Sequence, residues 1–167
     1  MKRDTITIRL DKFSQAKYLN DCILREKGRG NDTISVKIAD SYTGSNVCAP
    51  ISGIIDFHRT RGMKIRVGCP INSYASHVRI YNPIEIEELE NEISPFDKVL
   101  TFNSEDGVFK IVNMYSLALR QSDEMENGVI KSMEWCMNEA IDNVLQHSMA
   151  QKGFVMAQLH KQSKTFS

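Results

Sequence analysis

The sequence lacks a long hydrophobic run, a net charge and a high cysteine content, and each shortage excludes a class of protein. No stretch approaches the ~18 apolar residues of a membrane-spanning helix. No apolar segment of signal-peptide length follows the N-terminus. The four cysteines of the 167-residue chain include no C-x-x-C pair, so neither a zinc site nor a disulfide scaffold is indicated. We therefore expect a cytoplasmic protein with free thiols and no membrane partner.

The charges balance, because Lys+Arg and Asp+Glu both number 21. Nucleic-acid-binding domains usually carry a basic excess, so nucleic acid is not indicated as a partner. A local basic cluster is typical of a solvated face, and it comprises Arg59, Arg61, Lys64 and Arg66.

The first half of the sequence alternates strand-like and helix-like patterns. Apolar residues at every second position predict strands over 5–10, 33–39 and 64–69, with a further strand at 78–81. Helical spacing predicts helices over 14–26 and 47–60, the second with Pro50 in its first turn. This order is typical of the α/β class with crossover connections.

An acidic segment separates this half from the rest. Residues 85–92 contain five glutamates between two prolines, and we interpret 83–95 as a solvated, partly helical linker. The predicted domains are therefore 1–82 and 96–167. Within the second domain, 108–116 has mixed strand and helix signals, and 154–160 is predicted to be a strand.

A long amphipathic helix is predicted from Ser122 or Asp123 to about Ser148. Its apolar stripe is formed by Val129, Met133, Met137, Ala140, Ile141, Val144, Leu145 and Ser148. Glu139, Asn143 and His147 lie beside the stripe at intervals of four residues, which places them on one helix face. A carboxylate can take a proton from water, and a carboxamide oxygen can bind a hard cation such as Mg²⁺.

The run from Glu139 to Asn143, E-A-I-D-N, resembles the N-box of the GHKL ATPases, which include gyrase B, Hsp90 and the histidine kinases. The following N-V-L-Q-H-S resembles the histidine-kinase and anti-sigma version. The resemblance implies that Glu139 activates the hydrolytic water and Asn143 binds the Mg²⁺ that bridges the phosphates of ATP. It also implies that His147 contacts the nucleotide, so ATP and Mg²⁺ are the expected cofactors.

The resemblance covers the first part of the GHKL α/β sandwich. The D-x-G-x-G segment that holds adenine and the glycine-rich lid do not occur before Ser167. We therefore expect Mg-dependent ATPase or kinase activity in a complete domain, and none from this chain alone.

Residues 34–67 resemble the STAS domain of anti-sigma-factor antagonists. In that family a serine between the loop and the helix is phosphorylated by a GHKL-type kinase, and Ser45 is nearest by position. The D-S-S-G-type sequence of the family is replaced here by G-S-N-V, so an ordinary helix cap is the alternative. The pair of resemblances implies a bacterial regulatory protein with a nucleotide and a protein partner, and a homodimer is possible. The competing hypothesis is a non-catalytic interaction module whose helix 123–148 packs against a partner.

Overall fold

The computed structural model describes residues 5–9, 12–39, 45–89, 96–121, 126–147, 151–160 and 165–166. Contacts divide the chain into two compact units. The first comprises Met1–Pro83, Phe96–Val99 and Met156–Ser167, and the second comprises Ile84–Pro95 and Leu100–Val155. Both units combine helices with a small sheet, so the predicted α/β class is confirmed. None of the helices in the described part combines the length and apolar character needed to cross a bilayer.

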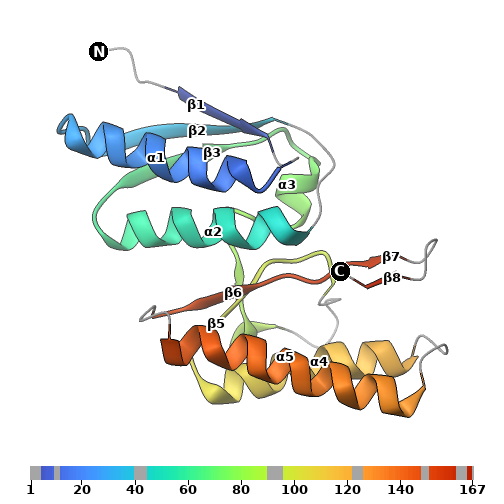
Figure 1. The fold of residues 1–167 in the computed structure, drawn as a ribbon. Helices are drawn as coiled ribbons and strands as arrows, with labels where there is room; N and C mark the ends of the chain where they lie inside the picture. Colours follow the sequence, from blue (N-terminus) through green and yellow to red (C-terminus); the bar gives the residue numbers. More distant parts are fainter. Residues whose placement is uncertain are drawn as a thin grey trace. The chain divides into compact units, whose positions relative to one another are not determined.

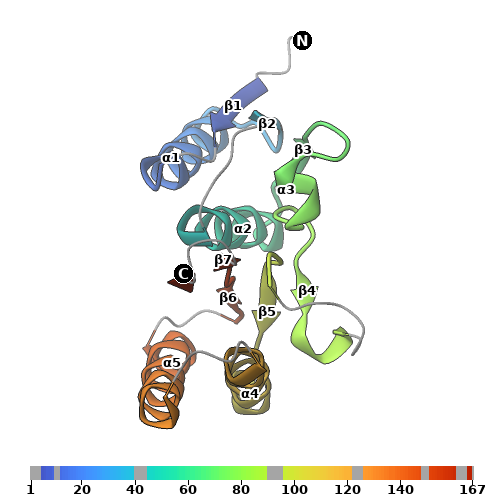
Figure 2. The same cartoon turned by 90° about the vertical axis from the view of Figure 1, so that its right-hand side faces the viewer.

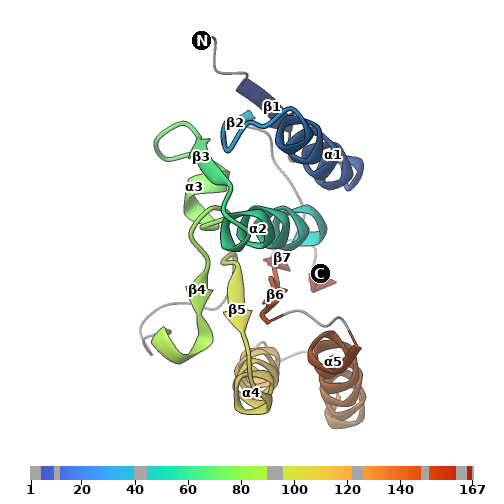
Figure 3. The same ribbon diagram turned by 90° about the vertical axis from the view of Figure 1, so that its left-hand side faces the viewer.

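The first unit is built on a parallel three-stranded sheet (Figure 1). Its elements are β1 (Thr5–Arg9), α1 (Ser14–Gly28), β2 (Thr33–Ala39), α2 (Ser45–Thr60), β3 (Lys64–Gly68) and the short α3 (Tyr74–His77). These bounds confirm the strands predicted over 5–10, 33–39 and 64–69 and the helices predicted over 14–26 and 47–60. Parallel neighbours must be joined by crossovers, and right-handed crossovers put both helices on one face of a sheet whose strands follow chain order. Figures 2 and 3 show α1 and α2 on the same side of the sheet.

Alternation along the strands separates the core from a polar face. On the side of the helices, Ile8, Val36 and Ile38 are almost fully buried. On the other side, Thr7 and Lys37 are exposed. Burial of the apolar side chains against α1 and α2 therefore explains why the strands keep this register.

Helices α1 and α2 end in turns of the same type. Gly30 and Gly62 have positive φ angles, which glycine adopts without steric cost. The amide of Met63 donates to the carbonyl of His58, and the amide of Asn31 donates to that of Glu26. Each bond spans six residues around the glycine, as in a Schellman motif. These turns stop the helices and lead directly into β2 and β3.

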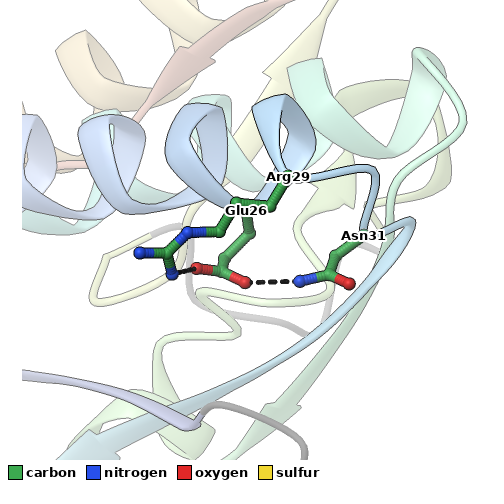
Figure 4. Close-up of polar contacts among 3 residues, drawn as sticks. All are labelled: Glu26, Arg29 and Asn31. Atoms are coloured by element: carbon green, nitrogen blue, oxygen red, sulfur yellow. Dashed lines mark hydrogen bonds and ion pairs between the residues drawn. The ribbon is translucent and has the colours of Figure 1, made fainter.

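An apolar contact between the residue after the glycine and the last turn of the helix usually accompanies this motif. After α1, a polar contact takes its place (Figure 4). Asn31 Nδ2 donates to Glu26 Oε2 at 2.7 Å, and Arg29 Nη1 donates to Glu26 Oε1 at 2.6 Å. Glu26 is buried, so its carboxylate needs both donors. The hydrogen bond from Asn31 is the main reason why the pKa of Glu26 is lowered, and Arg29 adds to it.

A buried histidine joins α1 to α2. His58 is only 1% exposed, and its Nε2 lies 2.9 Å from Asn20 Oδ1. Its Nδ1 has no hydrogen-bond partner among the described residues. Burial lowers the pKa of His58, and the positive charges of Lys27 and Arg61 lower it further. The neutral imidazole is therefore the form that fits between the helices.

The strand predicted at 78–81 is wrong. Val78 and Ile80 are fully buried, but they lie in a turn after α3, and Arg79 has a φ of 59° that interrupts any extended run. Ser52 Oγ donates to the carbonyl of Ile80 at 2.5 Å. The spacing of two residues therefore reflects two anchors of a turn rather than one face of a strand.

Arg59 fastens the same turn to the edge of the sheet. Its Nη1 donates to the carbonyl of Tyr81 at 3.0 Å, and its Nη2 donates to that of Ile65 in β3 at 2.9 Å. Arg59, which was predicted to belong to a solvated basic cluster, therefore stabilises the fold by joining this turn to β3.

The second unit has a mixed sheet and two long helices. Its elements are β4 (Ile84–Glu85), the 3-10 helix η1 (Ile86–Glu88), β5 (Leu100–Phe102), α4 (Glu105–Gln121), α5 (Asn127–His147) and β6 (Gly153–Val155). The strand order is β4-β5-β6, with β4 parallel and β6 antiparallel to β5. Helices α4 and α5 lie side by side beneath β5 and β6 in Figure 1.

The structure differs from the prediction in two segments, 83–95 and 154–160. Residues 84–88 form a strand and a 3-10 helix whose Ile84 and Ile86 are buried, because these side chains complete the small core of the second unit. Residues 90–95 lie outside the described part. The strand predicted over 154–160 is split, because β6 ends at Val155 and a separate pair follows, β7 (Leu159–His160) with β8 (Thr165–Phe166). The predicted domain boundaries stay a prediction.

A glycine faces an aromatic ring across the second sheet. Gly153 pairs with Phe102, and a Cβ atom built on Gly153 would lie 2.1 Å from the ring. The buried ring thus takes the space of the missing side chain, an arrangement that stabilises glycine in strands.

The histidine between α1 and α2 predicts a pH-dependent stability. As pH falls, the unfolded chain takes up a proton near the ordinary histidine pKa of about 6.5, before the folded chain does. The free energy of unfolding should therefore decline from about pH 6.5 down to the lower native pKa. Urea unfolding across this range should show a flatter profile for His58→Gln. His77→Gln alters an exposed histidine and should keep the wild-type slope. Identical profiles for wild type and His58→Gln would contradict the prediction.

The contact between Gly153 and Phe102 predicts a steric cost. Gly153→Ala should lower the free energy of unfolding by about 1–3 kcal/mol, because a methyl group would overlap the ring. Gly128→Ala is the matched control, since a Cβ there meets nothing within 4 Å and alanine favours the helix by up to ~1 kcal/mol. Urea denaturation of both variants checks this, and equal stabilities would contradict it.

Candidate functional site

Helix α5 packs one face against α4 and β6 and exposes another to solvent. Ile130 and Ile141 are buried, and the intervening Met133 and Met137 are half-buried. The predicted stripe is wrong at Val129 and Ala140, which are exposed, because contact with α4 and β6 covers a narrower strip than the pattern suggested. The predicted helix starts Ser122 and Asp123 and the predicted end Ser148 lie outside the described residues.

The three predicted site residues share the solvent face of α5. Glu139, Asn143 and His147 are all exposed. No hydrogen bond or ion pair found among the described residues involves their side chains. Neighbours four residues apart on a helix have Cβ atoms about 5–6 Å apart, so one ligand can reach two of them. Their groups are therefore free to bind something outside the helix.

Glu139 also lines a hollow between α4 and α5. The hollow measures about 250 Å³ and is lined by Glu105, Val108 and Phe109 of α4 and by Asn138, Glu139 and Asp142 of α5. Asn143 and His147 do not line it. The structure thus brings Glu139 beside two further carboxylates and leaves the other two predicted residues on the adjoining surface.

The antiparallel pairing of the two helices creates this arrangement. Arg120 Nη2 donates to Glu134 Oε1 at 2.6 Å near the far end of the pair, and this contact lowers the pKa of Glu134. With that register, the first turns of α4 meet the last turns of α5. Glu105 and Phe109 therefore come close to Asp142 and Glu139 although at least thirty positions separate them in sequence.

The carboxylates around the hollow decide what it can accept. Glu105, Glu139 and Asp142 are acidic residues, so an anion such as a triphosphate needs a cation to enter. Within the described ranges, no group of three His, Cys, Asp or Glu side chains is arranged to hold a metal ion alone. A Mg²⁺ ion commonly takes one or two protein ligands and completes its shell with phosphates and water, which suits a single carboxamide such as Asn143.

The sequence pattern missed one residue of this face. Trp135 is the one tryptophan of the chain, and it is 66% exposed. It lies one turn before Glu139 on the same side of α5. A bulky aromatic residue at a position that helical spacing assigns to the polar side was the available signal.

The candidate phosphorylation site is at the start of α2. Ser45 is the first residue of that helix, and its side chain lies outside the described part.

All four cysteines are free: Cys22 and Cys48 are buried, Cys69 is half-buried and Cys136 is exposed.

Comparisons with protein-family models, with curated proteins and with solved structures returned no match. The GHKL and STAS resemblances therefore stay predictions that depend on the quoted motifs.

The exposure of the site residues predicts that they contribute little to folding. Glu139→Gln and Asn143→Ala should each change the free energy of unfolding by less than about 0.5 kcal/mol. Ile141→Ala, on the buried side of the same helix, should cost about 2–4 kcal/mol. Chemical denaturation of the three variants checks this. A loss for Asn143→Ala comparable with that for Ile141→Ala would mean that the carboxamide is structural.

Proposed function

We propose that α5 forms one wall of a Mg–ATP site in a cytoplasmic regulatory protein of the GHKL ATPase or kinase type. The observation that carries this proposal is the position of Glu139 and Asn143. They lie one turn apart on the solvent face of α5, without partners among the described residues, within the E-A-I-D-N run. The alternating strands and helices of the first unit are compatible with a STAS-like regulatory part.

Glu139, Asn143 and His147 each have a role in this proposal. In a complete domain, the Glu139 carboxylate would orient a water molecule and take its proton during hydrolysis. The Asn143 carboxamide oxygen binds Mg²⁺, and His147 contacts the nucleotide. When bound, Mg²⁺ neutralises charge on the phosphates. The exposure of α5 on this side leaves these groups accessible to a nucleotide.

The charges near Glu139 make the proposed binding dependent on a divalent ion. ATP without a metal would bring four negative charges beside Glu105, Glu139 and Asp142, which is unfavourable at these short distances. The D-x-G-x-G and lid motifs do not occur in this sequence. We therefore expect the 167-residue chain to bind Mg–ATP weakly and not to hydrolyse it.

Paramagnetic NMR tests the proposal at the weak affinity expected. In the ¹⁵N-labelled chain, Mn²⁺ in place of Mg²⁺, with millimolar ATP, should broaden the amide signals around Glu139 and Asn143. Asn143→Ala should remove this broadening, since the carboxamide oxygen is the proposed ligand. Asn113→Ala changes an exposed carboxamide of α4 and should leave the broadening intact.

Two outcomes would overturn the proposed metal role. One is broadening that is equal in wild type and Asn143→Ala, and the other is no broadening of α5 at all. Broadening that is strongest around Glu105 in α4 and persists in Asn143→Ala would place the metal in the hollow and away from Asn143.

The second candidate function is a non-catalytic interaction module. The exposure of three large apolar side chains in the second unit, Phe109, Leu117 and Trp135, favours it, because a protein partner would remove apolar surface from water. This function predicts that Mn–ATP leaves α5 unchanged and that Trp135 emission shifts to shorter wavelength in a complex.

A further inference from the structure

The side of the first sheet that faces away from α1 and α2 is uncovered in the described part of this unit. We call it the open face; its residues are Thr5, Thr7, Arg9, Thr33, Ser35, Lys37, Ala39, Lys64, Arg66 and Gly68. Their side chains are exposed or half-buried. All-parallel sheets are normally covered on both sides, so an uncovered side calls for a second layer.

The strand register places the basic groups of the open face together. Thr5, Ser35 and Arg66 form one row across the three strands, and Thr7, Lys37 and Gly68 form the next. Arg66 and Lys37 are therefore diagonal neighbours, with strands about 4.8 Å apart and residues two positions apart separated by about 6.6 Å. Two cations thus flank the hydroxyl of Ser35.

The rows enclose a hollow of about 560 Å³. Its lining residues include Thr5, Ser35, Lys37, Arg66 and Gly68 of the open face, with Val36, Val67, Cys69 and Pro70 beside them. The missing side chain of Gly68 leaves room there, because a Cβ atom at this position would meet nothing within 4 Å. An incoming group can therefore approach the backbone between two positive charges.

The charge of the open face has one sign. Arg9, Lys37, Lys64 and Arg66 are basic, and none of its ten residues is acidic. Lys64 pairs with Asp32 beside the face, at 3.4 Å. Among the described residues, the other three charged groups have no ion-pair partner. Charge complementarity thus points to an anionic partner.

The dimensions and composition of the open face favour a helix over a nucleic acid. Seven-residue β2 spans about 23 Å, the length of a helix of about 15 residues. The face is three strands wide, which accommodates a helix of about 10 Å diameter. It contains no aromatic side chain, so the stacking by which single strands are commonly held is missing. Its rows of small hydroxyl residues suit close packing of a helix.

We propose that the open face docks an acidic helix of a partner protein, with Arg66 and Lys37 binding its carboxylates. The helix takes the place that a second helical layer has in doubly wound folds. This interface is on the first unit and involves none of the residues assigned to Mg–ATP, so the two proposals can fail independently.

A titration of the ¹⁵N-labelled full chain tests the interface. The probe is a capped alanine-based helical peptide of about 15 residues with glutamates three and four positions apart along one face. It should shift the amides of β1, β2 and β3, and the shifts should weaken as salt is raised. A peptide with glutamine in place of every glutamate is the control for charge, and oligothymidylate is the competing anion.

Three variants sharpen the test. Arg66→Glu should weaken peptide binding by about tenfold or more, because it puts a like charge at the centre of the interface. Gly68→Leu should weaken binding by filling the hollow while leaving the fold intact, since open space surrounds that position. Lys12→Glu makes the same charge change at an exposed residue before α1 and should leave the affinity unchanged.

The results separate the alternatives. Equal binding of the glutamine peptide, or equal weakening by Lys12→Glu and Arg66→Glu, would overturn the proposal. Binding of oligothymidylate to β1–β3 without binding of the acidic peptide would also overturn it and identify a nucleic-acid surface. No shift of these strands with any probe would show that the open face is only solvated.

Discussion

The parallel pairing of β2 with both of its neighbours is the constraint on which the first unit depends. Parallel strands require crossovers, and crossovers of one hand put α1 and α2 on the same side of the sheet. The large apolar residues of each strand must then face that side, and the polar ones face away. The open face is therefore the other half of the arrangement that forms the core, and its row of basic groups follows from the same register.

The ends of the helices obey the same constraint. Each crossover must reverse direction within a few residues, and Gly30 and Gly62 supply the left-handed conformation that makes this possible. The two turns differ in their side-chain contacts. At the end of α2, His58 and Met63 are both buried. At the end of α1, Glu26 and Asn31 are joined by a hydrogen bond between their side chains. A carboxylate with two donors can thus replace an apolar contact, at the cost of making the turn dependent on its ionisation.

Period-two patterns were reliable where burial on one face was their only cause. The bounds of β2 match the predicted range, because polar and apolar residues alternate from Thr33 to Ile38. The same spacing at Val78 and Ile80 arose from two anchors of a turn, and nothing in the sequence discloses the positive φ of Arg79. At the candidate site, the stripe on α5 was predictable from its spacing. The contribution of Glu105 and Phe109 was not, since it depends on how two helices pair across an intervening turn.

A net charge of zero concealed two surfaces of opposite sign. The chain-wide balance was the reason not to expect a nucleic-acid partner, and total charge governs long-range attraction. Docking depends on charges within a few ångströms, because salt screens exposed charges beyond about 8–10 Å. The open face and the carboxylates around Glu139 belong to separate units, so neither cancels the other within its own unit. Composition thus bounds how the protein meets its partners in solution, whereas strand register and helix pairing determine which partner each surface can hold.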